Sequence, residues 1–370
     1  MLLHGNQRPY RVVADAVTTI EIRNSQHSYQ AVIASNLLDR SGELIARKIR
    51  GSRCAIIADT NVAPLFADRV TKGLVSTGFQ PTLITVAAGE KSKTFGQAGE
   101  ICERMLAAKL GRQSFVVGLG GGMVGDLSGF VAAIFERGVQ HVQFPTTLLA
   151  MVDSSIGGKT GVNTAAGKNL IGAFHHPELV IDDVDVLKTL PRREFNQGFA
   201  EIIKHAIIAD AEMFAALQHV DLGELAPLIR RNIEIKSSIV ARDERDRTGE
   251  RALLNFGHTV GHAIEQAGNY EQFLHGEAIS LGMVAACAVS AKKAGLPKDQ
   301  REAIVDLLRV FELPVRLPPN FPREKLFDAL VFDKKFEDGK VRFVVSSTIG
   351  SAHLSSDVTL NDIREAVAEL

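Results

Sequence analysis

The sequence predicts an α/β domain built on a parallel sheet, followed by a mostly α-helical domain. Up to about residue 190, short β-branched runs alternate with helical patterns, which is the order of a parallel sheet covered by helices. Beyond residue 190, almost every apolar pattern has helical periodicity. A chain of 370 residues also exceeds one small core. We therefore divide it into residues 1–190 and 191–370.

The expected strands of the first half are short runs rich in valine, isoleucine and phenylalanine. They lie at residues 54–59, 81–88, 114–120, 141–145 and 179–183. Helices are expected between the first three strands, near residues 63–78 and 94–110. In the second half we expect one strand at residues 340–347 and helices at residues 198–217, 222–242, 253–267, 277–294 and 298–311. A ligand site is expected where the two domains meet.

The composition excludes several classes of partner. The net charge is −1, so no overall positive field attracts nucleic acid or an anionic membrane. Cys54, Cys102 and Cys287 form no CxxC pair, which is typical of a reducing compartment. No apolar run is long enough to span a bilayer, and the first residues show no signal-peptide pattern. We therefore expect a cytoplasmic protein that binds neither nucleic acid nor membranes.

A glycine-rich segment, GLGGGMVGDLSGF (118–130), follows a strand and opens a helix. Gly120, Gly122 and Gly125 have the spacing that lets a backbone approach a pyrophosphate at a helix N-terminus. The alternative is a tight turn with close packing of helix against sheet. No acidic residue follows about 20 positions later to meet a ribose, but Asp59, at the end of an earlier strand, could do so. We expect a Rossmann-like dinucleotide-binding domain in a variant arrangement.

The segment 144–177 is dense in glycine and polar residues, including Asp153, Lys159, Lys168 and Asn169. Such a segment can cradle phosphate oxygens, or it can be a solvated surface loop. The next segment, GFAEIIKHAII (198–208), is apolar except for Glu201, Lys204 and His205. A carboxylate in such a helix needs a metal or a cation, and an ion pair of Glu201 with Lys204 is the alternative.

A histidine cluster follows. Asn255, His258 and His262 are spaced by three and four residues and share one helix face, and His275 begins the next helix. Histidines at i and i+4 can bind one divalent metal. Three histidines in this short stretch, together with Glu201, favour a metal site over structural histidines.

Seven blocks of the sequence form a recognisable set: GGGMVGDLSGFVAAIFERG, FPTTLLAMVDSSIGGKTGVN, GKNLIGAF, LKTLP, GFAEIIKH, RALLNFGHTVGHAIE and HGEAISLGM. They resemble the signature blocks of 3-dehydroquinate synthase, a sugar phosphate cyclase. They occur in the family's order, and the resemblance runs from about residue 50 to about residue 350. It implies a dehydroquinate synthase-like fold, NAD held by the glycine loop, and a zinc or cobalt ion.

The resemblance also implies roles for individual residues. Glu201, His258 and His275 resemble the metal ligands, so His262 becomes a substrate contact in place of the i, i+4 metal pair. The residues that resemble the family's NAD-binding residues are Asp59, Asn61, Glu90, Lys93, Gly120, Gly121, Gly122, Asp126, Thr146, Thr147, Lys159, Lys168 and Thr189. The residues that resemble the family's substrate contacts are Asp153, Lys159, Asn169, Lys204, Lys236, Arg251, Asn255, His262 and a lysine of DKK, Lys334 or Lys335. Arg137 resembles an arginine that reaches the neighbouring site of a homodimer.

Two positions depart from the family pattern. Thr164 stands where family members often carry histidine. The stretch 243–251 is a residue longer than usual, which weakens the assignment of Lys236. Neither departure touches the proposed metal ligands.

The implied substrate is 3-deoxy-D-arabino-heptulosonate 7-phosphate, which carries a phosphate and a carboxylate. The resemblance implies oxidation of the C5 alcohol by NAD, β-elimination of phosphate, reduction, and aldol closure to 3-dehydroquinate in the shikimate pathway. Lys159, Lys236, Arg251 and a DKK lysine are local cations that suit both anions.

Three rivals remain open. A sibling cyclase would act on sedoheptulose 7-phosphate or an amino analogue, but VDSSIGGKTGVN, Asn255, His262 and DKK favour the dehydroquinate type. A polyol dehydrogenase of the same superfamily would release NADH. A non-enzymatic dinucleotide sensor would not need a metal triad beside a set of anion-binding residues.

Overall fold

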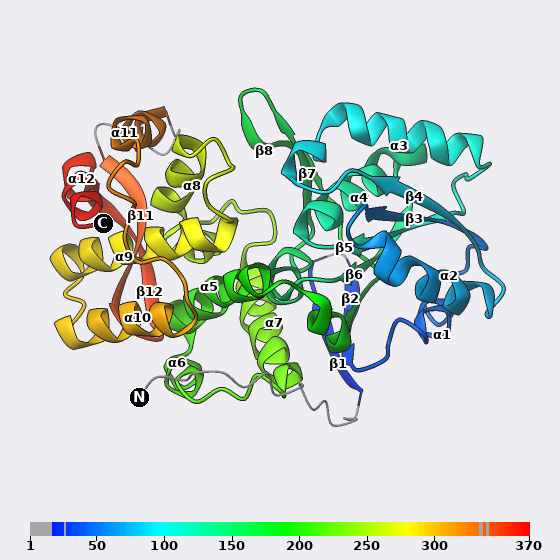
Figure 1. Cartoon of the computed structure of the whole chain (residues 1–370), viewed down its shortest axis with the longest axis horizontal. Coiled ribbons are helices and arrows are strands. Elements are labelled where there is room, and N and C mark those ends of the chain that lie inside the picture. Colours follow the sequence, from blue (N-terminus) through cyan, green and yellow to red (C-terminus); the bar gives the residue numbers. More distant parts are fainter. Residues whose placement is uncertain (1–16, 26, 333–335, 338–339) are drawn as a thin grey trace.

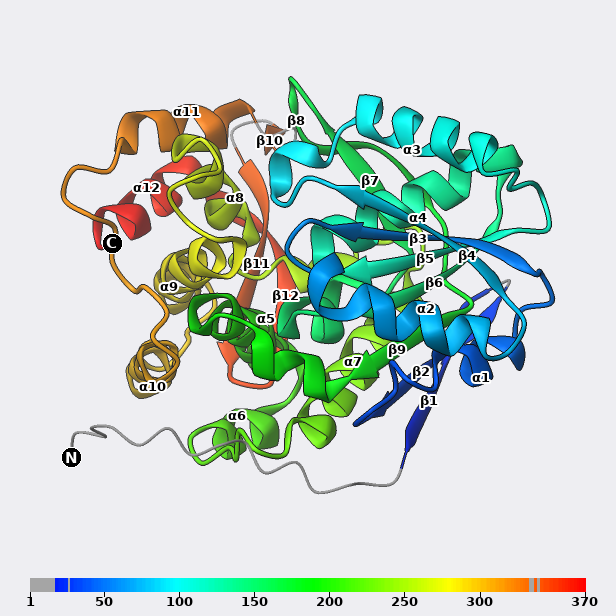
Figure 2. The same cartoon turned by 45° about the vertical axis from the view of Figure 1, so that its right-hand side comes forward.

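The computed structural model describes residues 17–25, 27–332, 336–337 and 340–370. Its first half contains a seven-stranded sheet in the order β1-β2-β9-β6-β5-β3-β4 (Figures 1 and 2). Within this sheet, only β1 runs antiparallel to its neighbour. The strands are β1 (Thr18–Arg23), β2 (Ser28–Ala34), β3 (Arg53–Asp59), β4 (Gln80–Val86), β5 (Phe115–Gly120), β6 (Gln140–Pro145) and β9 (Leu179–Asp183). The predicted parallel sheet is therefore confirmed.

Helices cover both faces of this sheet, which explains why its central strands are continuous apolar runs. On one face, α3 (Phe95–Ala107) and α4 (Gly122–Ile134) pack with Ile57 and Val116. On the other face, Ile56 and Phe115 join the cluster that contains residues of α1 (Ser41–Ala46) and α2 (Asp68–Val75). The carboxyl ends of β3, β5 and β6 share one sheet edge.

The polar segment 144–177 is mostly ordered secondary structure. A π-helical turn (Ala150–Ser154) leads into an antiparallel hairpin of β7 (Lys159–Thr164) and β8 (Gly167–Phe174). Thr164 closes the hairpin turn, because its Oγ1 accepts a hydrogen bond from the N–H of Ala166 and donates one to the carbonyl of Gly167. Most of this segment is therefore regular structure and not a loop, although β8 is largely exposed to solvent.

The second half is mostly helical, as predicted. Its helices are α5 (Arg192–Ala209), α6 (Ala211–Leu217), α7 (Leu225–Arg242), α8 (His258–Ala267), α9 (His275–Lys293), α10 (Lys298–Val310), α11 (Arg323–Phe332) and α12 (Leu360–Ala368). The predicted helix 198–217 is divided, because Asp210 ends α5 and caps α6 by accepting from the N–H of Met213. The expected strand at 340–347 is β11 (Lys340–Thr348), which lies between β10 (Phe336–Glu337) and β12 (Ser351–Thr359).

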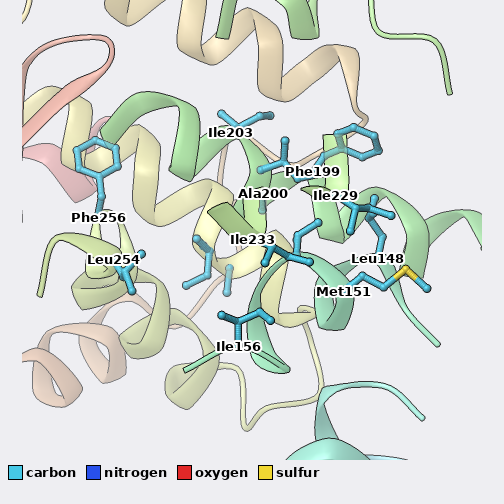
Figure 3. Packing of buried hydrophobic residues seen from close by; sticks show 14 of the residues in the cluster. Leu148, Met151, Ile156, Phe199, Ala200, Ile203, Ile229, Ile233, Leu254 and Phe256 are labelled. Atoms are coloured by element: carbon cyan, nitrogen blue, oxygen red, sulfur yellow. The ribbon is translucent and has the colours of Figure 1, made fainter. Parts of the chain in front are cut away.

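The two halves share a buried apolar junction (Figure 3). Leu148 and Met151 meet Phe199 and Ile203 of α5 and Ile233 of α7 in one continuous cluster. This packing fixes the polar residues of the π-helical turn against α5 and α7. The division of the chain at residue 190 stays a prediction. Within the described ranges, no helix is both long and apolar enough to cross a lipid bilayer.

Candidate active site

Three side chains from three helices converge as the metal prediction requires. Glu201 lies on α5, while His258 and His275 begin α8 and α9. The Nε2 atoms of His258 and His275 lie 3.4 and 3.5 Å from Oε1 of Glu201. Ligand atoms of a tetrahedral zinc ion with bonds of about 2.0–2.1 Å lie about 3.4 Å apart, so this spacing suits such an ion.

The surroundings of the three side chains also fit a divalent cation. Glu201 is fully buried, and its Oε1 has no hydrogen-bond partner among the described residues. The other ring nitrogens face oxygens, since Nδ1 of His258 lies 3.2 Å from the carbonyl of Phe256 and Nδ1 of His275 lies 3.4 Å from Glu265. Such contacts orient ligating histidines. A buried acceptor without a partner, facing two imidazole nitrogens, is the donor set that zinc or cobalt takes.

His262 does not complete this cluster. Its side chain is exposed, and its ring lies 5.2 Å from that of His258 in an edge-on arrangement. Within the described chain, His262 groups with Glu265 and His275, and another group joins Asp153, Glu201 and His205. Lys168 forms an ion pair with Glu265, and Lys236 forms one with Asp153, so these two groups have fewer ligand atoms available for a metal. The i, i+4 pair of His258 and His262 is not brought together as one metal site.

A buried charge cluster lies beside the metal ligands. Lys204, 1% exposed, contacts Glu201 through its Nζ and lies 3.8 Å from Oδ1 of Asp153. Burial alone would raise the pKa of Asp153, but the charges of Lys236 and Lys204 outweigh it and hold that pKa below its ordinary value. Burial lowers the pKa of Lys204, yet Glu201 and Asp153 reverse this and raise it. Both groups therefore stay charged and can orient substrate hydroxyls.

The glycine loop joins β5 to α4 with little space for side chains. A Cβ on Gly120 would lie 2.6 Å from Val124, and one on Gly121 would lie 3.0 Å from Thr147. A Cβ on Gly122 would meet Ser154 at 3.0 Å. Gly120 thus serves close packing of helix against strand, and the N–H groups at the start of α4 are the ones that could bind a phosphate. Oγ1 of Thr146 is buried without a hydrogen-bond partner in the described part of the chain, which suits a polar ligand.

Asp59 lies at the same sheet edge as the glycine loop, because β3 pairs with β5. Its Oδ1 accepts hydrogen bonds of 2.8 and 2.9 Å from the N–H groups of Asn61 and Val62. One carboxylate oxygen therefore shapes the turn, and Asn61 is exposed beside it. This placement fits the expected contact of both residues with an adenosine ribose.

Lys93 is the centre of a polar network beside the loop. It is 3% exposed, and its Nζ lies 2.5 Å from Oδ2 of Asp126 and 2.6 Å from Oδ1 of Asn169. Glu90 accepts a hydrogen bond of 2.8 Å from Nδ2 of Asn163. The network ties the hairpin β7–β8 to the start of α4.

Two of the expected anion-binding residues, Arg251 and Lys159, differ in their surroundings. Arg251 is buried and donates to the carbonyls of Glu244 and Gly157 at 2.8 and 3.1 Å. Lys159 is instead 52% exposed and lies 2.7 Å from Asp246. Arg251 is therefore enclosed by backbone carbonyls, whereas Lys159 is open to solvent beside a carboxylate.

The remaining expected residues are distributed over several places. Asn255 is half-buried at the end of a 3-10 helix (Arg251–Asn255), near the start of α8. Thr189 is exposed, and its Oγ1 donates to the carbonyl of Val186. Arg137 is exposed before β6, whereas Thr146 follows this strand of 6 residues, so on the order of 20 Å separates them. Lys334 and Lys335 lie outside the described residues.

Sequence reasoning missed the acidic partners of the expected cations. Glu265 contacts both Lys168 and His275, and Asp246 contacts Lys159. A signal for Glu265 exists, because it lies three residues after His262 on the same helix face. Asp246 has no such signal, since it lies in an irregular loop.

Comparison with known proteins identifies relatives over most of the chain. Models of the 3-dehydroquinate synthase N-terminal and C-terminal domains match residues 83–197 and 198–336. A 3-dehydroquinate synthase of Desulforamulus reducens is 41% identical over 358 residues, which covers 95% of this chain and 99% of the relative. One from Brucella anthropi is 43% identical over 358 residues, covering 94% of each chain.

Solved structures of two cyclases have the same fold. ValA, a 2-epi-5-epi-valiolone synthase from Streptomyces hygroscopicus solved with NAD+ and Zn2+, is 28% identical with a TM-score of 0.84, covering 94% of this chain and 98% of ValA. A 2-deoxy-scyllo-inosose synthase solved with carbaglucose-6-phosphate, NAD+ and Co2+ has a TM-score of 0.87 at 24% identity, covering 95% of this chain and 100% of that one.

Proposed function

This chain belongs to the 3-dehydroquinate synthase family, and from this premise we propose how its residues convert 3-deoxy-D-arabino-heptulosonate 7-phosphate to 3-dehydroquinate and phosphate. It is a phosphate-eliminating carbon–oxygen lyase that uses NAD and a divalent metal. The observation that supports this reading best is the convergence of Glu201, His258 and His275 beside the buried charges of Lys204 and Asp153.

Bound NAD would supply reversible hydride transfer, and Glu201, His258 and His275 would hold a zinc or cobalt ion that would make hydroxyl protons more acidic. The chain's own residues then position the reacting groups. Lys204 is fixed between two carboxylates, so its Nζ can donate to a substrate hydroxyl without changing its place. Asp153 stays ionised and can accept a hydrogen bond from another hydroxyl. Such positioning supplies much of the catalysis.

The two substrate anions require cations. Arg251 is held by two carbonyls and lies 5.8 Å over the ring of Phe174, so its orientation is fixed before substrate arrives. Lys159 must exchange Asp246 for a substrate oxygen. Asn255, His262, Lys236 and the DKK lysine complete the proposed set around the substrate.

We also propose a homodimer in which Arg137 serves the neighbouring site. Support comes from the position of Arg137, which is at the opposite end of β6 from Thr146 and cannot reach its own glycine loop. The strand β8 exposes Leu170, Ile171 and Phe174 by 63%, 41% and 46%, and an exposed apolar strand is suited to contact with a second copy.

The three free cysteines agree with a reducing cytoplasm.

One assay tests this function. The chain is incubated with 3-deoxy-D-arabino-heptulosonate 7-phosphate and less NAD than substrate, and phosphate and 3-dehydroquinate are measured. Equal amounts of both products, exceeding the NAD supplied, are expected because NAD is regenerated. Turnover of sedoheptulose 7-phosphate instead would assign a sibling cyclase, and net NADH release would assign a dehydrogenase.

A further inference from the structure

A single carboxylate, that of Glu265, joins a metal-site histidine to the hairpin of the first half. Its Oε1 lies 2.8 Å from Nζ of Lys168 on β8, and its Oε2 lies 3.4 Å from Nδ1 of His275. Glu265 is only 4% exposed. Because a buried carboxylate needs partners to remain charged, its two oxygens tie the positions of Lys168 and His275 together.

The loop after α8 holds Lys168 in this place. Nζ of Lys168 lies 4.5 Å from the ring centroid of Tyr270, which is a cation–π contact. Asn269 and Tyr270 have φ angles of 54° and 58°, a left-handed conformation that residues other than glycine rarely adopt. The N–H of Tyr270 donates to the carbonyl of Glu265 at 2.8 Å, so the ring and the carboxylate that hold Lys168 are themselves linked.

The next residue of the hairpin reaches the glycine loop. Oδ1 of Asn169 accepts from Lys93, whose Nζ also contacts Asp126 in α4. Contacts therefore run without interruption from Asp126, through Lys93 and the hairpin, to Glu265 and His275. Figure 1 shows the tip of the β7–β8 hairpin extending toward α8.

We propose that Glu265 is a positioning residue that couples the dinucleotide site to the metal site. A ligand at the glycine loop stabilises the position of the hairpin and Lys168, Lys168 holds Glu265, and Glu265 fixes the ring of His275. This inference rests on the proposed function, which places NAD and the metal at these sites. Since coupling between binding sites is reciprocal, NAD+ must raise the affinity for the metal by the factor by which the metal raises the affinity for NAD+.

The chain provides a matched control. Lys91 and Glu271 form a second ion pair of 2.7 Å between the same two parts of the chain. Both side chains are largely exposed, by 88% and 64%, and neither belongs to the metal cluster or to its partners. Lys91→Met therefore removes a contact between the halves while leaving the path to His275 intact.

The experiment measures binding on the full chain. Affinity for Co2+ is determined by competition with a chelator, without NAD+ and with saturating NAD+, and affinity for NAD+ is determined with and without Co2+. For the wild type and Lys91→Met we expect coupling of about fivefold or more, within the usual range of about 5–150-fold. Glu265→Gln and Lys168→Met should each reduce it below about twofold. The factor is a ratio, so any direct contact of Lys168 with NAD does not alter its meaning.

The visible absorption of bound Co2+ gives a second readout, because it reports the surroundings of His275. NAD+ should shift this spectrum in the wild type and in Lys91→Met but not in Glu265→Gln. The inference is overturned, and the proposed function is not, if coupling persists in both Glu265→Gln and Lys168→Met. The same holds if the wild type binds both ligands without coupling. Failure of the wild type to bind either ligand overturns the proposed function as well.

Discussion

Oδ1 of Asp153 lies 2.8 Å from Nζ of Lys236, and the same Nζ donates a hydrogen bond of 2.6 Å to the carbonyl of Asp153. Lys236 is 6% exposed, and burial lowers the pKa of its ammonium group despite the opposing charge of Asp153. Lys236→Met removes the nearer of the two cations beside this carboxylate, while Lys204 stays 3.8 Å from it. The free energy of unfolding should therefore fall, by less than the roughly 3–5 kcal/mol of a buried charge left without any partner, as measured by urea denaturation.

The double variant Asp153→Asn/Lys236→Met separates this ion pair from general packing. Because it removes both charges, its loss should be smaller than the sum of the two single losses. Strict additivity would mean that the two charges do not stabilise each other.

Metal binding should stabilise the fold, because the three ligands come from three helices. At a Zn2+ concentration of about 100 times the Kd, the gain in unfolding free energy should be about 2.7 kcal/mol. Glu201→Gln should lose this gain, while His219→Gln, on an exposed residue outside the metal groups, should keep it. Chelation should also abolish turnover, and zinc or cobalt should restore it. Full activity in a sample shown to be metal-free would contradict the site.

Asp182 predicts a dependence of stability on pH. It is fully buried on β9, and neither carboxylate oxygen has a hydrogen-bond partner among the described residues, so burial raises its pKa well above the ordinary value. At pH values between the pKa of the unfolded aspartate and the raised pKa of the folded chain, the folded chain keeps this proton and the unfolded chain loses it. The stability of the wild type should therefore fall as pH rises from about 4, the pKa of an unfolded aspartate, toward the raised folded pKa.

Asp182→Val should remove this dependence. A polar group buried without a hydrogen bond costs about 1–3 kcal/mol, so the variant should be more stable than the wild type by about that amount at neutral pH. The difference should shrink as pH falls toward about 4. Asp306→Asn, on an exposed aspartate, serves as the control. A pH-independent difference between Asp182→Val and the wild type would show that Asp182 does not titrate on unfolding.

The predicted parts of the fold are those whose residues carry one strong pattern. The strands β3 and β5 are buried on both faces and read as continuous apolar runs, so they were predictable. The strand β1, TTIEIR, does alternate in exposure, but its two apolar residues gave too weak a signal. The hairpin β7–β8 was missed because glycine, lysine and asparagine interrupt its short apolar runs, and its order comes from packing against α4 and from Lys93.

The candidate site shows the same limit. Glu201 and the histidines were found because carboxylates and imidazoles are unusual in apolar helices. Ion pairs such as Lys159 with Asp246 join residues 87 positions apart. No local pattern encodes such a contact, because it depends on how the hairpin meets the loop after α7.

Arg137 predicts complementation between subunits. Arg137→Ala and His275→Ala should each be inactive, because one lacks the cation supplied to the neighbour and the other lacks a metal ligand. When the two variants are mixed and allowed to exchange subunits, one site of the mixed dimer has both residues. Some activity should return, as measured by phosphate release. Absence of rescue despite demonstrated mixed dimers would contradict a shared site.

The last prediction concerns Lys159, for whose ammonium group Asp246 and a substrate phosphate compete. Nζ of Lys159 lies 2.7 Å from Asp246, and both side chains are partly exposed, by 52% and 32%. An exposed pair of this kind contributes only about 0.2–1 kcal/mol, so a substrate phosphate can displace Asp246. Asp246→Asn should therefore tighten binding of a phosphonate analogue that can be oxidised but cannot eliminate.

Lys159→Ala should weaken binding of this analogue, and adding Asp246→Asn to it should give no recovery, because the group for which the two anions compete is gone. The wild type should accumulate enzyme-bound NADH with the analogue, which absorbance follows. Arg251→Ala should weaken binding more than Lys159→Ala does, since Arg251 is buried and truncation of a desolvated charge costs about 2–5 kcal/mol. If the analogue lacks its carboxylate, its affinity for Arg251→Ala should then fall little further. If Asp246→Asn leaves affinity unchanged while Lys159→Ala lowers it, Asp246 does not compete with the ligand, and the ammonium group must reach phosphate without leaving its partner.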